Sequence, residues 1–238
     1  MKNSLSLIIT AYNEAPIIED CVHTCIDSLS TQFDDYELIL VNDASVDSTG
    51  KLMDELARKY QNIIVLHNPI NLNMGLSVQR GMKYATKDYV AFNAADLPFD
   101  PTQYTELMEQ APNADMIVVE RIKYNGTSIR RRIFSKLNWA IMRTLFPHLM
   151  RKIHDTNYFQ IARTAILPQI KPHATGPIFT WPEMIFRAIR AGLSVVTVKA
   201  EYNPRHIRKG AFGKPHDILW GLREMLQFRL FLWHHHTG

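Results

Sequence analysis

The sequence predicts an α/β fold in which a mostly parallel sheet is flanked by helices. Two observations predict it: short apolar runs of strand length recur, and the segments between them carry apolar residues at helical spacing. The runs expected to be strands in the first hundred residues are 5–9, 37–41, 63–67 and 89–92. The helices expected between them are 15–29, 50–60 and 76–85. Such βαβ units build a parallel sheet with right-handed connections.

From residue 100 onward the rhythm changes. A helix over 102–110 and a strand over 115–120 precede a long stretch, 128–153, in which arginine alternates with large apolar residues. This stretch is too charged to span a bilayer but suited to lie on one, and the alternative is a pair of helices packed in the core. The remaining predicted elements are a helix over 181–191, a strand over 194–198, a basic loop over 202–215 and an amphipathic helix over 217–233.

Length and composition predict one domain of 238 residues, with 1–100 and 101–238 as two packed halves. A hydrophobic content of 46% is ample for a core. We find no leader at the N-terminus and no run of about 18 uncharged apolar residues, so we expect neither secretion nor a membrane span. Cys21 and Cys25 lie four residues apart on a predicted helix, which indicates buried thiols in a reducing cytoplasm.

Three of the predicted strands end in carboxylates and amides. Asn13 and Glu14 follow the first strand, Asn42 and Asp43 follow the second, and Asp96 follows the strand at 89–92. In open α/β folds the carboxyl ends of neighbouring parallel strands share one edge of the sheet, where ligands bind. Carboxylate oxygens suit a hard divalent cation that is shared with substrate phosphates. The sequence therefore predicts an oxygen-rich ligand site at this edge.

A glycine-rich phosphate loop is absent from the sequence. Residues 10–14 follow the first strand where a Rossmann dinucleotide site needs G-x-G-x-x-G, and no Walker A sequence occurs. These absences argue against a dehydrogenase and a P-loop enzyme. They leave a nucleotide held by side chains and a metal ion. Asp47, which precedes a predicted helix, is interpreted as a helix cap rather than a ligand.

The basic excess, 27 Lys and Arg against 23 Asp and Glu, lies mostly late in the chain. Its clusters are 130–132, 151–152 and 205–214. Clusters of this kind suit phosphate or an anionic membrane surface, and for each one a solvated face is an equally good explanation. We expect no nucleic-acid partner.

Four ordered motifs resemble those of family 2 glycosyltransferases, which have the Rossmann-like GT-A fold. The motifs are 8–14, 41–49, 73–75 with Gly81, and 94–97. Further segments resemble the branch of dolichyl-phosphate mannose synthases and bacterial polyprenyl-phosphate sugar transferases. They are 132–138, 155–160, 183–192 and the basic loop before the last amphipathic helix. The resemblance covers nearly the whole chain and implies a GT-A sheet with an acceptor half that carries amphipathic helices.

The resemblance also implies roles for individual residues. The donor-binding residues would be Ala11, Tyr12, Glu14, Asp43, Asn73, Gly75, Ala95 and Lys214. The catalytic residues would be Asp96, Asp155, Arg205 and Arg208. Asp43 would contact the base, and Asp96 would hold the Mg²⁺ or Mn²⁺ that bridges the donor diphosphate. Arg131 and Arg132 would bind an acceptor phosphate, with the apolar residues between 133 and 145 on the membrane. For Asp155 the alternative is a helix cap.

Position 94 departs from the family pattern, because Ala94 stands where the first acid of an Asp-x-Asp motif is usual. A divalent ion would lose one oxygen ligand. Three explanations stay open: Asp96 suffices together with diphosphate oxygens and water, Asp100 or Asn93 compensates, or metal dependence is weak. The basic loop also departs from the family spacing, with Gly210 and Gly213 but no serine.

The resemblance thus implies an inverting glycosyltransferase that moves a hexose from GDP-mannose or UDP-glucose to a polyprenyl or dolichyl phosphate. A lipid phosphate, with a second pKa near about 6, is already an anion at neutral pH, whereas a hydroxyl acceptor needs a base. The second half lacks an adjacent Glu-Asp pair, which favours the phosphate. We expect peripheral attachment to the cytoplasmic face of a membrane, and a separate membrane-anchor subunit is compatible with this. The alternatives are transfer to a saccharide hydroxyl in surface polysaccharide synthesis and a catalytically inactive nucleotide-sugar-binding protein.

Overall fold

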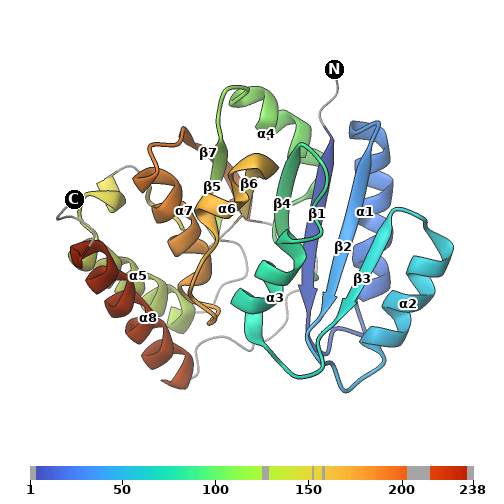
Figure 1. Cartoon of the computed structure of the whole chain (residues 1–238), viewed down its shortest axis with the longest axis horizontal. Coiled ribbons are helices and arrows are strands. Elements are labelled where there is room, and N and C mark those ends of the chain that lie inside the picture. The colour runs from blue at the N-terminus through green and yellow to red at the C-terminus, as the bar shows by residue number, and fades with distance from the viewer. Residues whose placement is uncertain (1–3, 125–128, 152, 157–158, 203–214, 235–238) are drawn as a thin grey trace.

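A mixed β-sheet runs through the molecule in the computed structural model, which describes residues 4–124, 129–151, 153–156, 159–202 and 215–234 (Figure 1). The strands are β1 (Leu5–Ala11), β2 (Tyr36–Asn42), β3 (Ile63–His67), β4 (Tyr89–Ala94), β5 (Met116–Tyr124), β6 (Phe159–Arg163) and β7 (Val195–Tyr202). Within these segments the sheet has seven strands in the order β3-β2-β1-β4-β6-β5-β7. Strands from both predicted halves therefore share one sheet.

The first four strands pair in parallel, as predicted. β1 lies between β2 and β4, and β3 pairs with the outer side of β2. The register sets Ala11 beside Asn42 and Thr10 beside Ala94. The carboxyl ends of β1, β2 and β4 therefore lie along the same edge of the sheet, which faces the bottom of Figure 1.

Strand β6 was not predicted from the sequence. It is antiparallel to both of its neighbours, β4 and β5, whereas β5 and β7 are parallel. Its five residues, FQIAR, mix polar and apolar side chains and show no clear alternation. Because backbone hydrogen bonds from two flanking strands are available at this position, tertiary pairing decides the conformation of this segment.

Helices cover both faces of the sheet. They are α1 (Ile18–Gln32), α2 (Thr49–Lys59), α3 (Asn73–Met82), α4 (Tyr104–Gln110), α5 (Ile129–Leu145), α6 (Leu167–Ile170), α7 (Thr180–Arg190) and α8 (Pro215–His234). Short 3-10 turns occur at Pro101–Gln103, Leu149–Arg151 and Thr164–Ile166. Helix α3 begins three residues before its predicted start, so Asn73 and Gly75 lie in its first turn rather than in a loop.

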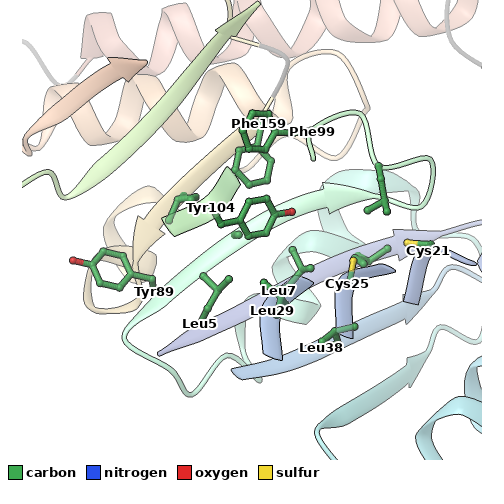
Figure 2. Packing of buried hydrophobic residues seen from close by; sticks show 14 of the residues in the cluster. Leu5, Leu7, Cys21, Cys25, Leu29, Leu38, Tyr89, Phe99, Tyr104 and Phe159 are labelled. Carbon is green, nitrogen blue, oxygen red and sulfur yellow. The ribbon is translucent and has the colours of Figure 1, made fainter. Parts of the chain in front are cut away.

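Alternation along the strands divides the core between the two faces. Leu5, Leu7 and Ile9 of β1 pack with residues of α1, α2 and α4, as Figure 2 shows in part. Ile8 points to the other face and packs with residues of α3, α6 and α7. Each fully buried aliphatic side chain of this kind stabilises the fold by about 1.5–3 kcal/mol. These two layers hold the strand ends in register.

The two cysteines are free and buried on α1, as predicted. A hydrogen bond with Cys25 and burial raise the pKa of the Cys21 thiol well above its ordinary value. The Cys21 thiol therefore stays protonated at neutral pH, and both buried cysteines pack as small apolar side chains.

A third apolar cluster joins α5, α7 and α8. Phe146, which follows α5, contacts Phe179, Phe186 of α7 and Phe228 of α8, with ring centroids 5.1–5.8 Å apart. Helices α5 and α8 lie side by side at the outer end of the molecule (Figure 1). Within the described segments, no helix combines the length and the apolar character that a bilayer crossing needs.

Candidate functional site

Asp43 is a buried acid directly after β2, at the carboxyl edge of the sheet. The residue is 5% exposed, and Oδ1 accepts hydrogen bonds from Asn68 Nδ2 and from the Leu72 N–H, both at 2.7 Å. Among the described residues no donor reaches Oδ2. One carboxylate oxygen is thus held by the protein, and the other remains an acceptor for a ligand N–H.

The loops after β1 and β2 are joined by hydrogen bonds. The Asp43 N–H donates to the Ala11 carbonyl at 2.9 Å, the Asn13 N–H donates to Ser45 Oγ at 3.0 Å, and the Glu14 N–H donates to Thr49 Oγ1 at 2.8 Å. Asn13 has a positive φ of 56°, which asparagine tolerates better than most residues. The segment that contains Tyr12 and Glu14 is therefore fixed relative to Asp43.

Tyr12 offers an aromatic surface at this edge. It follows β1 directly, and 47% of the residue is exposed. Stacking of a base on an aromatic ring contributes about 1–3 kcal/mol in single-stranded nucleic-acid complexes, where it is insensitive to base identity. An exposed ring beside an acid with a free acceptor oxygen has the chemistry to hold a nucleobase.

Asp47 has the structural role that the sequence predicted. Its Oδ1 accepts the N–H of Thr49, the first residue of α2, at 3.0 Å, and its Oδ2 accepts the Ala15 N–H at 3.2 Å. Burial alone would raise the pKa of Asp47, but the hydrogen bonds from Thr49 and Ala15 outweigh it and lower the pKa below its ordinary value of 3.8. Asp47 therefore stabilises the helix start and the loop that carries Glu14.

The turn after β4 carries Asp96 and is shaped by Asn93. Asn93 Nδ2 donates to the Phe99 carbonyl at 2.9 Å and to Tyr104 Oη at 2.8 Å, and its Oδ1 accepts the Ala94 N–H. The rings of Phe99 and Tyr104 stack on Phe159 of β6 with centroids 4.5 and 4.9 Å away (Figure 2). The amide of Asn93 is thus used to build the turn.

Asp100 also has a structural role, because its Oδ1 accepts the N–H and the hydroxyl of Thr102 at the start of a 3-10 turn. The side chain of Asn93 and Oδ1 of Asp100 are thus engaged within this turn, whereas no donor among the described residues reaches Oδ2 of Asp100. Asp96, half-buried in the same turn, is the first carboxylate after β4.

The carboxylates at this edge suit only a divalent cation that is shared with a bound ligand. In the described part of the chain no three His, Cys, Asp or Glu side chains gather in a metal-binding arrangement. Mg²⁺ is commonly bound through one or two carboxylates together with substrate phosphates. Asp96 therefore suits a cation that arrives with a diphosphate, but not a cation held by the protein alone.

The other residues predicted to bind the sugar donor are explained mainly by packing and backbone conformation. Ala11 and Ala95 are buried in the core, so only their backbone is available to a ligand. Asn73 is half-buried with a φ of 64° at the start of α3. Gly75 packs against the loop before α7: a Cβ there would lie 2.3 Å from the Ala174 carbonyl oxygen.

Asp155 lies in a buried ion pair instead of capping a helix. Arg121 of β5 donates to both of its oxygens, with Nη2 2.8 Å from Oδ1 and Nε 2.5 Å from Oδ2. The neighbouring His154 N–H donates to Glu120 Oε1 at 2.6 Å. The segment 153–156 is thereby fixed to the end of β5. An acid–base chemistry for Asp155 would have to operate from within this bidentate pair.

Arg205, Arg208 and Lys214 lie outside the described residues. Arg131 and Arg132 lie in α5, but their side chains are not described.

Sequence reasoning missed two partner residues, Asn68 for Asp43 and Arg121 for Asp155. Asn68 directly follows β3 and precedes Pro69. An amide at the end of a predicted strand could have been recognised as a further polar group at the carboxyl edge of the sheet. Nothing in the local pattern marked Arg121.

Comparison with known proteins gives the family. A family model described as glycosyl transferase family 2 matches residues 6–180. The uncharacterized glycosyltransferase YibD of Escherichia coli (strain K12) is 38% identical over 121 residues, 50% of this chain and 33% of that protein. The uncharacterized glycosyltransferase EpsJ of Bacillus subtilis (strain 168) is 30% identical over 160 residues, 65% of this chain and 44% of that protein. The chain thus spans less than half the length of these relatives.

A third relative, the dolichyl-phosphate beta-glucosyltransferase ALG5A of Trichomonas vaginalis, is 29% identical over 97 residues, 39% of this chain and 30% of that protein. Among solved structures, glucosyl-3-phosphoglycerate synthase from Mycobacterium tuberculosis in complex with Mn²⁺, UDP and glucosyl-3-phosphoglycerate matches with a TM-score of 0.68. It is 21% identical and covers 95% of this chain and 80% of its own, which shows a common GT-A fold. Since the family model extends over most of the sheet and all four motifs at its edge, the chain belongs to glycosyl transferase family 2.

Proposed function

We propose that this chain transfers a hexose from a nucleotide sugar to a lipid phosphate, with inversion at the anomeric carbon. The proposal that a nucleotide sugar binds here rests on Asp43. It is a buried acid with one oxygen engaged and one left as an acceptor, at the edge where β1, β2 and β4 end. The base would donate an N–H to Oδ2 and stack on Tyr12, with Glu14 near the ribose.

UDP-glucose is the better supported donor, and GDP-mannose is the alternative. The similar solved structure contains UDP and a glucosyl product, and two relatives are named glucosyltransferases, one of dolichyl phosphate and one of poly(ribitol-phosphate). These names support glucose as the transferred sugar.

The reaction breaks the bond between the anomeric carbon and the diphosphate as an acceptor oxygen forms a new bond from the opposite side. Negative charge accumulates on the departing diphosphate. A bound divalent cation would supply electrostatic stabilisation of that charge, and Asp96 would hold it. Arg205, Arg208 and Lys214 would add positive charge. A phosphate acceptor is anionic at neutral pH, so the attacking oxygen needs no base.

The outer face of α5 and α8 supports a membrane-borne acceptor. Exposed apolar residues lie on both helices: Ile133, Leu137, Leu219, Leu226, Leu230 and Trp233. Between the helices is a hollow lined by Ala140, Ile141, Thr144, Leu145 and Leu222. Exposed Lys136, Arg143, Arg223 and Arg229 flank this face. Apolar side chains rimmed by cations suit an anionic membrane surface, and we place the protein peripherally on the cytoplasmic face.

Two alternatives have support of their own. The relatives that act on poly(ribitol-phosphate) and the synthase of glucosyl-3-phosphoglycerate favour a hydroxyl acceptor that carries a phosphate elsewhere. Ala94, which stands in place of the first acid of the usual Asp-x-Asp motif, favours a nucleotide-sugar-binding protein without turnover.

Donor choice is tested by thermal shift with UDP-glucose and GDP-mannose, each with and without Mn²⁺. A ligand at 100 times its Kd stabilises the native state by about 2.7 kcal/mol. We expect a clear upward shift for one donor. No shift with any nucleotide sugar would contradict the proposal.

Acceptor choice is tested by incubating labelled donor with the enzyme and membranes, followed by organic extraction. We expect label in the lipid fraction, and label found only in water-soluble glycan would reject a lipid acceptor. Turnover is tested with Ala94→Asp: donor binding without hydrolysis or transfer in either protein would favour the inactive binder.

Membrane attachment is tested by co-sedimentation with anionic vesicles. Leu226→Glu should weaken binding, because it places a carboxylate within the apolar face of α8. Gln227→Glu adds the same charge at a neighbouring exposed position and is the matched control. Equal losses in the two variants would show a general charge effect instead of apolar contact.

A further inference from the structure

The segment 173–176, which precedes α7, is held by two buried carboxylates. Glu183 of α7 accepts the N–H groups of His173 and Ala174 at 3.0 and 2.7 Å. Glu224 of α8 accepts those of Thr175 and Gly176 through Oε1 at 2.7 and 2.9 Å. Four consecutive backbone donors are thus bound by side chains from two helices, which defines the position of this segment.

The same segment contacts the first turn of α3. The Gly75 N–H donates to the Thr175 carbonyl at 3.0 Å. A Cβ on Gly75 would lie 2.3 Å from the Ala174 carbonyl oxygen and 2.6 Å from the Thr175 Cα, both backbone atoms. Helix α3 and the segment 173–176 are therefore in direct backbone contact, and a shift of one displaces the other.

The first turn of α3 in turn orients Asp43. Leu72, which immediately precedes the helix, donates its N–H to Asp43 Oδ1 at 2.7 Å. A continuous series of contacts thus runs from Glu224 through Thr175, Gly75 and Leu72 to Asp43. Its outer end is on α8, far along the chain from the carboxylate at its inner end.

Glu224 is only 7% exposed, and its Oε2 has no hydrogen-bond partner within the described residues. Close packing around Glu224 and its helix leaves this side chain little room to move. A Cβ on Gly176 would lie 3.1 Å from Oε2, and a Cβ on Gly221 would lie 2.9 Å from Ile178. A buried carboxylate oxygen without a donor is costly, so packing by itself does not explain an acid at this position. What the structure uses is the acceptor oxygen Oε1, which holds the Thr175 and Gly176 N–H groups.

We infer that Glu224 is a positioning residue for the donor site. By holding Thr175 and Gly176 against Gly75, it fixes the start of α3 and with it the hydrogen bond that orients Asp43. The inference rests on the proposed role of Asp43 in donor binding. Glu224 itself touches no substrate.

Glu224→Ala tests this role, and Gln227→Ala, at an exposed position of the same helix, is the control. We expect the donor Kd and KM to rise about tenfold in Glu224→Ala with kcat within about threefold, an effect typical of residues that act without touching the ligand. Glu224→Gln keeps an oxygen acceptor and should recover most of the affinity. A folded Glu224→Ala protein with unchanged donor Kd would overturn the inference.

Hydrogen exchange separates failure of this inference from failure of the proposed function. Peptides that cover 68–77 should exchange faster in Glu224→Ala than in the wild type and in Gln227→Ala. If the wild type binds no nucleotide sugar, the proposed function fails, and unchanged exchange at 68–77 would independently overturn the inference. If the alanine variant does not fold, Glu224→Asp, which keeps the charge but shortens the reach, replaces it in both measurements.

Discussion

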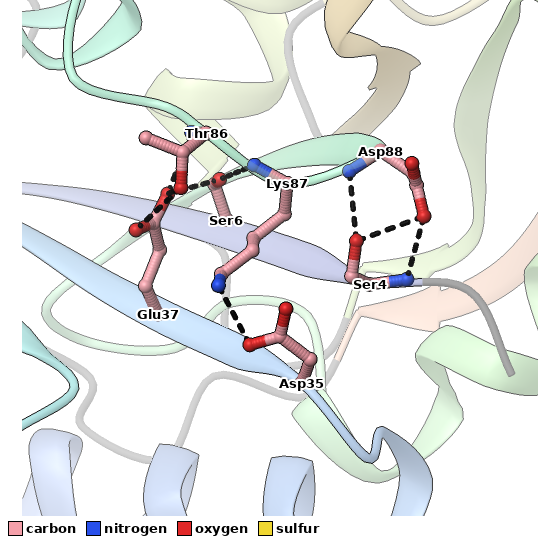
Figure 3. Close-up of polar contacts among 7 residues, drawn as sticks. All are labelled: Ser4, Ser6, Asp35, Glu37, Thr86, Lys87 and Asp88. Atoms are coloured by element: carbon pink, nitrogen blue, oxygen red, sulfur yellow. Dashed lines mark hydrogen bonds and ion pairs between the residues drawn. The ribbon is translucent and has the colours of Figure 1, made fainter.

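Strand β2 has a buried carboxylate at each end, and the two are partnered differently. At the amino end, Glu37 Oε1 accepts hydrogen bonds from Ser6 Oγ at 2.6 Å and from the Thr86 N–H at 2.8 Å, and Oε2 accepts the Thr86 hydroxyl at 3.0 Å (Figure 3). At the carboxyl end, the donors of Asp43 in the described part of the chain all reach Oδ1. Burial is nearly equal, at 7% and 5% exposure, so burial does not separate a structural acid from a ligand-binding one. The two acids differ instead in their oxygens, because both oxygens of Glu37 accept hydrogen bonds whereas Oδ2 of Asp43 stays available to a ligand.

The rest of the amino edge is also joined by polar side-chain contacts. Asp88 accepts from the Ser4 hydroxyl at 2.8 Å, Ser4 Oγ accepts the Asp88 N–H at 2.9 Å, and Lys87 pairs with Asp35 at 2.6 Å (Figure 3). These contacts join the starts of β1, β2 and β4. Both Ser4 donors reach Oδ2 of Asp88, and Lys87 reaches Oδ1 of Asp35, so these exposed acids each keep an oxygen for solvent among the described residues. The contrast between the two edges is therefore confined to the buried acids Glu37 and Asp43.

The largest expected effect is on donor binding. Asp43→Asn keeps an oxygen for Asn68 and Leu72 but replaces the free acceptor with an NH₂ group. Losing a hydrogen bond to a charged group costs about 1.5–3 kcal/mol, so donor affinity measured by calorimetry should fall about tenfold to a hundredfold. Glu37→Gln is the control at the other end of the strand. An equal loss of affinity in both variants would remove the distinction between the two acids.

The second effect is on stability. Glu37→Ala removes the acceptor of the buried Ser6 hydroxyl and of the Thr86 N–H on an exposed residue. An unsatisfied buried group such as the Ser6 hydroxyl costs about 1–3 kcal/mol. We expect the free energy of unfolding, measured in urea, to fall by that order with donor affinity unchanged in the folded protein. A weakened donor affinity would mean that the amino edge also shapes the site.

The smallest effect is the pH dependence of stability from one exposed acid at each edge. A hydrogen bond from the Ser4 side chain lowers the pKa of Asp88 below 3.8, and hydrogen bonds from Thr49 lower that of Asp47 against the effect of burial. A carboxyl with a lowered pKa in the folded state contributes stability above its unfolded pKa, which is lost as pH falls through the folded value.

Asp88→Asn and Asp47→Asn should therefore each reduce the drop in unfolding free energy between neutral pH and pH of about 3, by under about 1 kcal/mol because both groups are exposed. Urea titrations at both pH values measure this. A larger acid-induced drop in either variant than in the wild type would contradict the sign of the effect.

Local pattern was sufficient for the parallel half of the fold. Apolar runs and helical spacing located β1 to β4 and their helices, because side-chain periodicity reports which faces are buried. The same logic located Asp43 and Asp96 at one edge, since the ends of neighbouring parallel strands coincide. It failed for β6, whose five mixed residues form a strand because β4 and β5 flank them, and it misplaced the start of α3 by three residues.

By itself, then, the amino-acid sequence determined the fold class, the family motifs and the edge of the sheet on which the acids gather. Only the tertiary structure decided which oxygen of each acid is engaged. The partners of Asp43 and Glu37 are 25 to 49 residues distant along the chain, and the contacts from Glu224 to Gly75 join α8 to α3 through a segment with no recognisable motif. Local periodicity carries no information about such pairs, because they form only when the packed layers bring distant segments together.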